Sequence, residues 1–368
     1  MTGAKRTGAE RGRVSDEPRP TGAGRMGGNR ELAGAEQEGE ERADSGTDGV
    51  RAGVERDEAT RRDSNALAAA AENPRARFLF VSGSRVAVEP GAERVLAVSA
   101  GCVAPEARRR AVYLGLVDGA PYFACDVGDA DDSARDPRVV SRAIPAASRP
   151  AAVAEGDERA WSVSADFASV PLTSHLWPSV EAELAVEAVA ISNWIGGTRF
   201  CHRCGEPLSL RSGGWEMVCG RGHTVFPRVD PAVIMAVRDV EDRLLLARNG
   251  RWAPGRLSVL AGFVEAGEPL ESAVAREVLE ETGVVVDDVA YVTSQPWPFP
   301  RSLMLAFEGR TRARQEDVKV DGEELVFARF FSREEFSGAL ASGEIGLPTP
   351  TSVSARLIER WLGRPLVG

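Results

Sequence analysis

The chain has 368 residues, enough for about two or three domains. Its formal net charge of -10 at pH 7 argues against non-specific nucleic-acid binding and against a DNA partner, because such binding needs a basic surface. There is no apolar run of about 18 residues and no apolar stretch near the start, so we expect no membrane span and no signal peptide. The sparse, odd number of cysteines, five, argues against a disulfide framework and favours a cytoplasmic protein.

Residues 1–76 are predicted to form a disordered tail. Residues 1–75 contain no Phe, Trp or Tyr and mix both charge signs with Gly and Ala, so they bury too little apolar surface to offset their ordering entropy. A helical turn or two is compatible with the sequence of 66–72. Two roles stay open for the tail, a docking segment for a partner and a dispensable extension.

Residues 77–195 are predicted to form a small, strand-rich N-terminal domain. Apolar residues recur at helical spacing from 178 to 194, and Gly196 follows, so a helix should close this domain. The Ala-rich stretch 145–157 should be a loop. No catalytic constellation is visible, so we expect a domain that packs against the rest and contributes to a homodimer. The expected strands are 78–81, 86–88, 112–117 and 122–127, the last two joined by a hairpin turn.

A cysteine cluster occupies residues 196–228. Cys201 and Cys204 form one Cys-x2-Cys knuckle, and Cys219 lies fourteen residues further on. This spacing is typical of a zinc ribbon, in which four ligands hold a structural Zn²⁺. His223 is the expected fourth ligand. His202 is a rival with poorer geometry, and a ribbon that has lost its metal is the alternative to zinc binding.

Residues 229–368 are predicted to form an α/β/α sandwich, a mixed sheet with helices on both faces. The expected helices are 269–282, 333–342 and 352–362. The expected strands are 231–238, 243–247, 257–260, 289–293, 303–307 and 325–331.

The helix expected at 269–282 carries the acidic groups. Glu277, Glu280 and Glu281 fall within a sector of roughly 100°, and like charges so placed repel unless a cation lies beside them. Oxygen ligands of this kind suit Mg²⁺ or Mn²⁺. The alternative is an ordinary charged surface helix, in which Arg276 and Glu280 form an i,i+4 pair.

Residues 294–302 have the sequence SQPWPFPRS. Three prolines in five residues argue against a strand and favour a rigid, extended loop. Trp297 and Phe299 on such a loop could stack against a flat base, or could fill a gap between domains.

Two motifs together resemble a known family. Gly262, Glu268, the run from Arg276 to Glu281, and Gly283 with Val284 resemble the complete Nudix box, and SQPWPFP with Ser302 matches the motif of the NADH pyrophosphatase subfamily. Members of that subfamily also remove NAD caps from RNA. The resemblance covers about residues 77–365 and implies an N-terminal domain, a zinc ribbon and a Nudix domain.

The resemblance implies roles for single residues. Glu277, Glu281 and Glu324 match metal-binding glutamates, with Glu323 as an alternative to Glu324, and Ala261 matches a residue whose carbonyl binds metal. Glu280 completes the acidic face, and Arg276 is expected to orient a glutamate. The segment that would align with a basic substrate contact of the N-terminal domain, 169–174, has no arginine. Substrate contacts are implied for Phe226, Gln295, Pro296, Trp297, Pro298, Phe299, Pro300, Arg301, Ser302 and Ser354.

The implied reaction is hydrolysis of NAD(H) to NMN(H) and AMP with two or three Mg²⁺ or Mn²⁺ ions, and the 5′ end of NAD-capped RNA is a second implied substrate. Which glutamate accepts the proton stays open. One alternative is a Nudix hydrolase of another nucleoside diphosphate derivative, such as ADP-ribose. The other is a non-catalytic Nudix domain that senses a ligand, which the complete set of box glutamates argues against.

Overall fold

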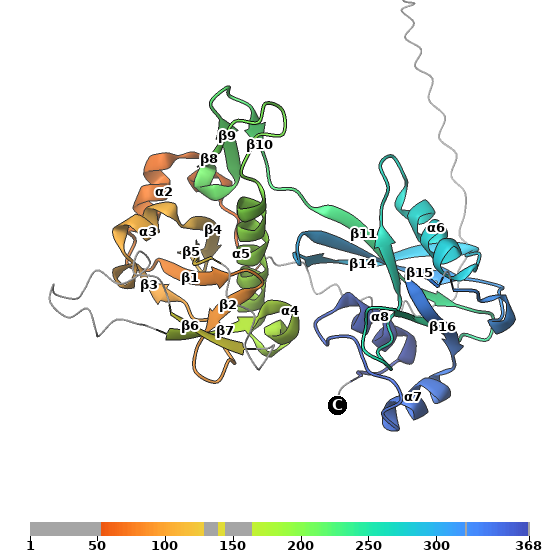
Figure 1. Cartoon of the computed structure of the whole chain (residues 1–368). Helices are drawn as coiled ribbons and strands as arrows, with labels where there is room; N and C mark the ends of the chain where they lie inside the picture. The colour runs from red at the N-terminus through yellow and green to blue at the C-terminus, as the bar shows by residue number, and fades with distance from the viewer. Residues whose placement is uncertain (1–52, 129–138, 144–163, 321, 367–368) are drawn as a thin grey trace, which may run out of the picture. The chain divides into compact units, whose positions relative to one another are not determined.

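A computed structural model describes residues 53–128, 139–143, 164–320 and 322–366 (Figure 1). We divide them into an N-terminal region (53–197), a cysteine ribbon (199–225) and a C-terminal region (230–366). The predicted loop at 145–157, and residues 1–52 of the predicted tail, lie outside the described residues.

Part of the predicted tail is helical. α2 (Ser64–Ala71) includes most of the helical turn or two that the sequence allowed at 66–72, whereas α1 (Glu58–Arg62) lies where we expected disorder. Val54 is fully buried, and the Asp57 carboxylate accepts a hydrogen bond of 2.7 Å from the Tyr113 hydroxyl. A few anchoring contacts to the neighbouring sheet therefore order a segment that has no aromatic residue of its own.

The N-terminal region is built on a seven-stranded sheet of order β4-β5-β1-β2-β7-β6, with β3 beside β1. β1 runs parallel to β5, and the other pairs are antiparallel. The predicted strands and hairpin are confirmed. The bounds are β1 Arg77–Ser82, β2 Arg85–Val88, β3 Val98–Ser99, β4 Val112–Val117, β5 Ala120–Asp126, β6 Val139–Ala143 and β7 Ser164–Ser169.

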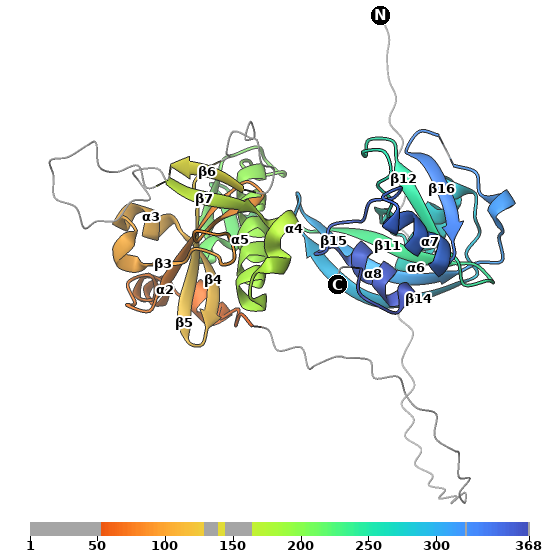
Figure 2. The same cartoon turned by 90° about the horizontal axis from the view of Figure 1, so that it is seen from below.

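Helices cover both faces of this sheet (Figures 1 and 2). Leu79 and Val81 of β1 pack against the long helix α5 (Ser179–Gly197), and Phe78 and Phe80 face the cluster that includes α2 and α3 (Pro105–Arg110). Neighbouring residues of a strand point to opposite faces, so this alternation divides the core into two layers. Shorter helical turns are α4 (Val170–Thr173), η1 (Ala100–Cys102) and η3 (Ser174–Leu176).

The cysteine ribbon follows α5 as a three-stranded sheet of order β10-β9-β8. The Trp215 indole N–H donates to the carbonyl of Tyr113 at 2.7 Å, and the Arg61 guanidinium lies 3.9 Å from the centre of the Trp215 ring. These contacts fix the ribbon to the N-terminal region. The bounds are β8 Leu208–Arg211, η4 Ser212–Gly214, β9 Glu216–Cys219 and β10 Thr224–Val225.

The C-terminal region is the predicted α/β/α sandwich, with α6 apart from α7 and α8 in Figure 1. In β11, Val233, Met235 and Val237 pack in the cluster that contains α6, whereas Ile234 and Ala236 pack in the cluster that contains α7 and α8. The sheet order is β14-β15-β11-β12-β16, with β13 beside β11. The bounds are β11 Asp230–Arg238, β12 Leu244–Asn249, β13 Leu260–Phe263, α6 Leu270–Thr282, β14 Asp288–Trp297, β15 Ser302–Arg310, η5 Gln315–Asp317, β16 Leu325–Phe331, α7 Arg333–Ala341 and α8 Val353–Leu362.

Two strand predictions in this region need correction. The strand expected at 257–260 begins at Leu260 and ends at Phe263. Residues 294–297, expected in a loop, are the end of β14, where Pro296 lies opposite Leu303. β14 is an edge strand, and an edge strand tolerates proline because one side of its backbone needs no ladder partner.

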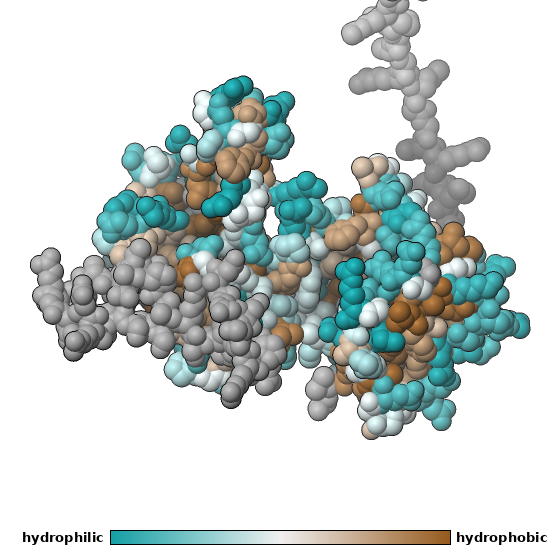
Figure 3. Space-filling view, viewed as in Figure 1, coloured by the Kyte–Doolittle hydropathy of each residue, from teal (hydrophilic) through white to brown (hydrophobic). Residues whose placement is uncertain are grey.

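The described part of the chain contains no helix that is both long and apolar enough to cross a membrane. On the face shown in Figure 3, hydrophilic residues alternate with apolar ones over both large regions. Exposed apolar side chains of the C-terminal region include Phe263, Leu279, Val285, Tyr291 and Phe327.

Candidate active site

Three glutamates of the box, Glu277, Glu280 and Glu281, are held by α6. Pro269 precedes the first helical residue, and Gly283 ends the helix in the left-handed conformation at φ 68°. The Gly283 N–H donates to the Leu279 carbonyl at 2.8 Å, which satisfies a carbonyl that the helix end leaves unpaired. Glycine adopts this backbone conformation at little cost, so the final glycine of the motif has a structural reason.

Gly262 brings β13 close to this helix. A Cβ atom at position 262 would lie 1.9 Å from Cδ of Glu277 and 2.2 Å from each of its carboxylate oxygens. No side chain fits in that space. The first glycine of the box therefore allows the Glu277 carboxylate to lie directly against the β13 backbone.

Arg276 ties the box together. Its guanidinium donates two hydrogen bonds to Glu268, at 2.8 and 2.9 Å, and single bonds to Glu277 at 2.9 Å and Glu280 at 3.0 Å. It also donates to the Phe263 carbonyl at 2.9 Å. These bonds lower the pKa of the Glu268 carboxyl and raise the pKa of the Arg276 guanidinium, with the Glu268 contact as the largest cause in both cases. Arg276 thus orients a glutamate, as expected.

Three carboxylates line one cavity of about 410 Å³. Glu277 and Glu281 come from α6, and Glu324 comes from the turn before β16. Burial raises the pKa of Glu277, and the neighbouring Glu280 and Glu324 carboxylates add to the shift. The side chain of Glu280 is 59% exposed and paired with Arg276, and Glu280 is absent from the lining of this cavity.

This cavity has the donor set of a hard divalent cation. Clustered, partly buried carboxylates are costly by themselves, and the raised pKa of Glu277 reflects that cost. A cation among the carboxylates and the Ala261 backbone would offset it, and oxygen ligands of this kind match Mg²⁺ or Mn²⁺. The residues present therefore fit such an ion.

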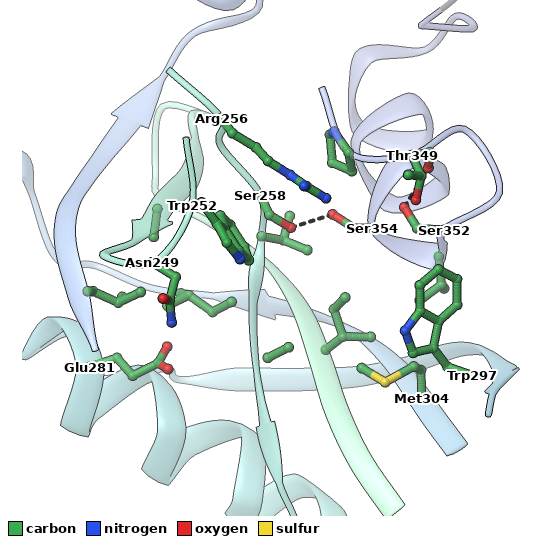
Figure 4. A pocket seen from close by; sticks show the side chains of 18 of the residues that line it. Asn249, Trp252, Arg256, Ser258, Glu281, Trp297, Met304, Thr349, Ser352 and Ser354 are labelled. Carbon is green, nitrogen blue, oxygen red and sulfur yellow. Dashed lines mark hydrogen bonds between the residues drawn. The ribbon is translucent and has the colours of Figure 1, made fainter. Parts of the chain in front are cut away.

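A second cavity, of about 320 Å³, adjoins the acidic one (Figure 4). Figure 4 shows Glu281 at one end and the indole rings of Trp252 and Trp297 on different sides of the space. Both cavities are lined by Ala261, Glu281, Met304 and Glu324. Two of the three carboxylates, Glu281 and Glu324, therefore lie where the two cavities meet.

Residues of the SQPWPFPRS segment have different surroundings. Gln295 lines the second cavity, but its amide is engaged: it donates to the Thr351 carbonyl and accepts from the Val353 N–H, both at 2.6 Å. Gln295 thus holds the N-terminus of α8 in place. Trp297 also lines the second cavity, and its ring meets that of Phe299 edge-on at 5.1 Å.

The rest of the segment is divided between the site and the surrounding structure. Ser302 lines the acidic cavity, whereas Arg301 bonds to Asp230 at 2.6 Å. The carbonyl oxygens of Pro298 and Pro300 accept hydrogen bonds from the Asn193 amide at 2.7 and 3.4 Å. Pro296 lies in β14, opposite Leu303.

Ser354 and Phe226 differ in their relation to the site. Ser354 is buried in the wall of the second cavity, and its hydroxyl lies 2.7 Å from that of Ser258. Phe226 is 65% exposed and belongs to the lining of neither cavity.

Two aromatic side chains of the site were not singled out from the sequence. Phe263, inside the box, lines the acidic cavity and is 61% exposed, which is unusual for a phenylalanine. Trp252 lines the second cavity. The alternation of β13 could have placed Phe263 on the open face of the sheet, but nothing in the sequence around Trp252 indicates which way that loop folds.

The cysteine cluster comes together as a separate site. Possible ligand atoms of Cys201, Cys204, Cys219 and His223 all lie within 4.8 Å of one another. The Cys201 sulfur is 3.6 Å from Nδ1 of His223, and the sulfurs of Cys204 and Cys219 are 3.7 Å apart. The rival His202 is not part of this group. Three sulfurs and one imidazole at such spacing could hold a tetrahedral Zn²⁺.

Comparisons with known proteins agree with this architecture. Residues 228–348 match the NUDIX domain model, and residues 75–194 match the model of the NADH pyrophosphatase-like rudimentary NUDIX domain. The NAD-capped RNA hydrolase NudC of Mycobacterium bovis is 37% identical over 84% of this chain and 93% of its own. NAD-capped RNA hydrolase NUDT12 of Macaca fascicularis is 38% identical over 50% of this chain and 42% of its own.

Among solved structures, a NUDIX hydrolase from Nitrosomonas europaea is similar with a TM-score of 0.30 and 26% identity, over 38% of this chain and 94% of that one. The identity to the mycobacterial protein extends over most of both chains, and the two domain models cover the N-terminal and C-terminal regions separately. The chain therefore belongs to the Nudix hydrolase family, in the group that joins an NADH pyrophosphatase-like domain to a Nudix domain.

Proposed function

We propose that this protein hydrolyses the diphosphate bond of NAD(H), and of NAD at the 5′ end of capped RNA. The observation that carries the proposal is the pair of cavities that share Ala261, Glu281, Met304 and Glu324. A dinucleotide has two nucleosides on either side of a diphosphate, so it suits two spaces that meet at a metal-binding group. The names of the relatives support the same substrate class.

We assign Mg²⁺ or Mn²⁺ to Glu277, Glu281, Glu324 and the Ala261 carbonyl. When bound, such ions neutralise the diphosphate and lower the pKa of the attacking water. Arg276 keeps the Glu277 carboxylate in place through its 2.9 Å bond, while its paired bonds to Glu268 fix its own position. Attack of water on one phosphorus breaks the bridging P–O bond and yields NMN(H) and AMP.

Aromatic side chains of the two cavities supply surfaces on which the nicotinamide and adenine rings of the substrate would stack. Phe263 is exposed beside the carboxylates in one cavity, and Trp252 and Trp297 flank the other. Stacking on such rings contributes about 1–3 kcal/mol per base. Gln295 contributes indirectly, because its amide positions the N-terminal turn of α8 at the cavity wall.

The Cys₃His group is the proposed site of a structural Zn²⁺, apart from the carboxylates. The domain boundaries, the cytoplasmic location and the homodimer expected from the sequence stay predictions.

Substitution of Glu281 by Gln tests the proposal. The variant keeps the shape of the side chain and removes one anionic ligand, so we expect loss of more than about 100-fold in kcat on both NADH and NAD-capped RNA in Mn²⁺. The matched control is Glu316→Gln, an exposed acid in η5 outside both cavities. Thermal melting should show both variants folded.

The alternatives predict different results. A hydrolase of ADP-ribose would cleave that compound with kcat/KM well above the value for NADH. A sensor would bind NADH in the presence of Mn²⁺ without turnover. Full activity of Glu281→Gln would refute the proposed metal site.

A further inference from the structure

The cavity that contains Trp252 has an arginine at its rim. Arg256 lies in the loop between β12 and β13, is exposed, and lines this cavity. Its guanidinium carbon is 5.4 Å from the centre of the Trp252 ring. Figure 4 shows the Arg256 side chain extended above Ser258, with Trp252 on one side and Thr349 and Ser354 on the other.

The charges in this cavity are separated. Its other charged lining residues, Glu281 and Glu324, belong to the proposed metal site, and Figure 4 shows Arg256 at the end away from Glu281. If the diphosphate binds at the carboxylates, Arg256 is at the far end of the nucleoside space. NAD(H) has no phosphate besides its diphosphate, so its own anionic groups do not account for a cation there.

The backbone around Arg256 is firmly held. The Gly346 N–H donates to the Gly255 carbonyl at 2.8 Å, and the Leu257 N–H donates to the Gly346 carbonyl at 3.2 Å. Gly255 has a φ of 81°, and a Cβ there would lie 2.7 Å from the Glu344 carbonyl oxygen. The loop is thus fixed on both sides of Arg256, so its side chain extends from a defined position on the rim.

We propose that Arg256 binds a phosphate group attached to the ribose of the nucleoside held in this cavity. This inference rests on the proposed function and deepens it: it names the residue that would contact the phosphate of a capped RNA, and it adds NADP(H) as a second substrate class. Two sources share that chemistry: the phosphodiester that continues an RNA chain from the adenosine of an NAD cap, and the extra ribose phosphate of NADP(H). A guanidinium forms paired, charge-assisted hydrogen bonds to either phosphate.

The experiment compares kcat/KM of Arg256→Gln on three substrates: NADH, NADPH and a short NAD-capped RNA. For each of the two larger substrates we take the ratio of its kcat/KM to the kcat/KM for NADH. We expect this ratio to fall about tenfold in Arg256→Gln, because the loss of one charge-assisted hydrogen bond has an effect of about that size. Arg251→Gln is the matched control, because Arg251 is an exposed arginine of the same loop that does not line the cavity. Its ratios should stay within about twofold of wild type.

The three substrates separate the two sources. A lower ratio for the capped RNA alone identifies the phosphodiester, a lower ratio for NADPH alone identifies the ribose phosphate, and a fall in both supports a site that accepts either. For the capped RNA, the fall of log kcat/KM with log salt should also become less steep in Arg256→Gln, by about one in the slope.

Several results would overturn the inference. Arg256→Gln could leave the kcat/KM ratios unchanged or lower kcat/KM equally on all three substrates, and Arg251→Gln could change the ratios as much as Arg256→Gln does. A wild-type enzyme that cleaves NADH but neither NADPH nor the capped RNA would also overturn it. If the wild-type protein cleaves none of the three, the proposed function itself fails, which is a distinct outcome.

Discussion

Gly262 and Glu277 are in such close contact that a methyl group on Gly262 would lie 1.9 Å from the Glu277 carboxyl carbon. Gly262 belongs to β13 and Glu277 to α6, so the contact joins the strand and the helix that carry three of the four proposed metal ligands, Ala261, Glu277 and Glu281. The side chain of Glu277 is only 14% exposed. A residue with no side chain is therefore required for the carboxylate to reach its position.

The variant Gly262→Ala should lose most of its activity and some of its stability. The added methyl group must displace the Glu277 carboxylate or shift β13, and such overpacking costs about 1–3 kcal/mol. We expect kcat on NADH to fall at least about 100-fold, measured at saturating Mn²⁺. Gly338→Ala in α7 is the control: a Cβ there meets nothing within 4 Å, so it should keep full activity and gain about 0.5–1 kcal/mol. Normal turnover by Gly262→Ala would contradict the steric argument.

The variant Arg276→Lys should impair metal activation although the charge is kept. A lysine cannot form the paired bonds to Glu268 while also donating to Glu277 and Glu280. We expect the Mn²⁺ concentration for half-maximal activity to rise about tenfold, with a smaller change in KM for NADH. Arg312→Lys is the control, because Arg312 is 89% exposed and has one ion pair of 3.5 Å. Equal Mn²⁺ dependence in the two variants would argue against a positioning role for Arg276.

Patterns within one element gave reliable predictions, because their causes are local. The helix that carries Glu277 and Glu281 is delimited by Pro269 and Gly283, and the alternation in β11 produces the two-sided core. The resemblance of the box and of SQPWPFP then indicated which acids to examine, and Glu324 does lie with Glu277 and Glu281 in one cavity.

The wrong predictions concern residues whose structure depends on contacts with segments far away in the sequence. Whether Pro296 can lie in a strand depends on β14 being an edge strand, which follows from the sheet order alone. Val54 and α1 are ordered by contacts to residues far along the chain, among them Tyr113. Trp252 reaches the site through the fold of a loop, and no periodicity predicts that.

The cysteine ribbon should contain one Zn²⁺ per chain, with His223 and not His202 as the fourth ligand. His223→Ala should lose most of the metal and melt at a lower temperature, because the metal contributes to folding. His202→Ala should keep both, since His202 is exposed and outside the ligand group. Metal analysis of the purified variants with thermal melting checks this. Equal zinc content in His202→Ala and His223→Ala would exclude His223 as a required ligand.

Glu187 should make the folding stability depend on pH. Its side chain is only 4% exposed, ion-paired with Arg56 and 3.5 Å from Arg61. Burial raises the pKa of Glu187 to about 7 from an ordinary value of 4.5, and the two arginines offset this only in part. Between about pH 4.5 and pH 7, Glu187 is therefore protonated in the folded state and ionised in the unfolded chain.

The sign of the effect follows from that difference. The stability linked to this proton is complete below about pH 4.5 and is lost as the pH rises through about 7. A shift of this size corresponds to about 3 kcal/mol of unfolding free energy, and Glu187→Gln removes the titrating group. Urea unfolding from pH 5 to 8 should give a wild-type curve that falls relative to that of the variant and runs parallel to it above about pH 8. Glu58→Gln, at a side chain 69% exposed, should follow the wild type. Parallel curves for wild type and Glu187→Gln across the whole range would mean that Arg56 and Arg61 keep Glu187 ionised in the folded protein, so that pairing outweighs burial.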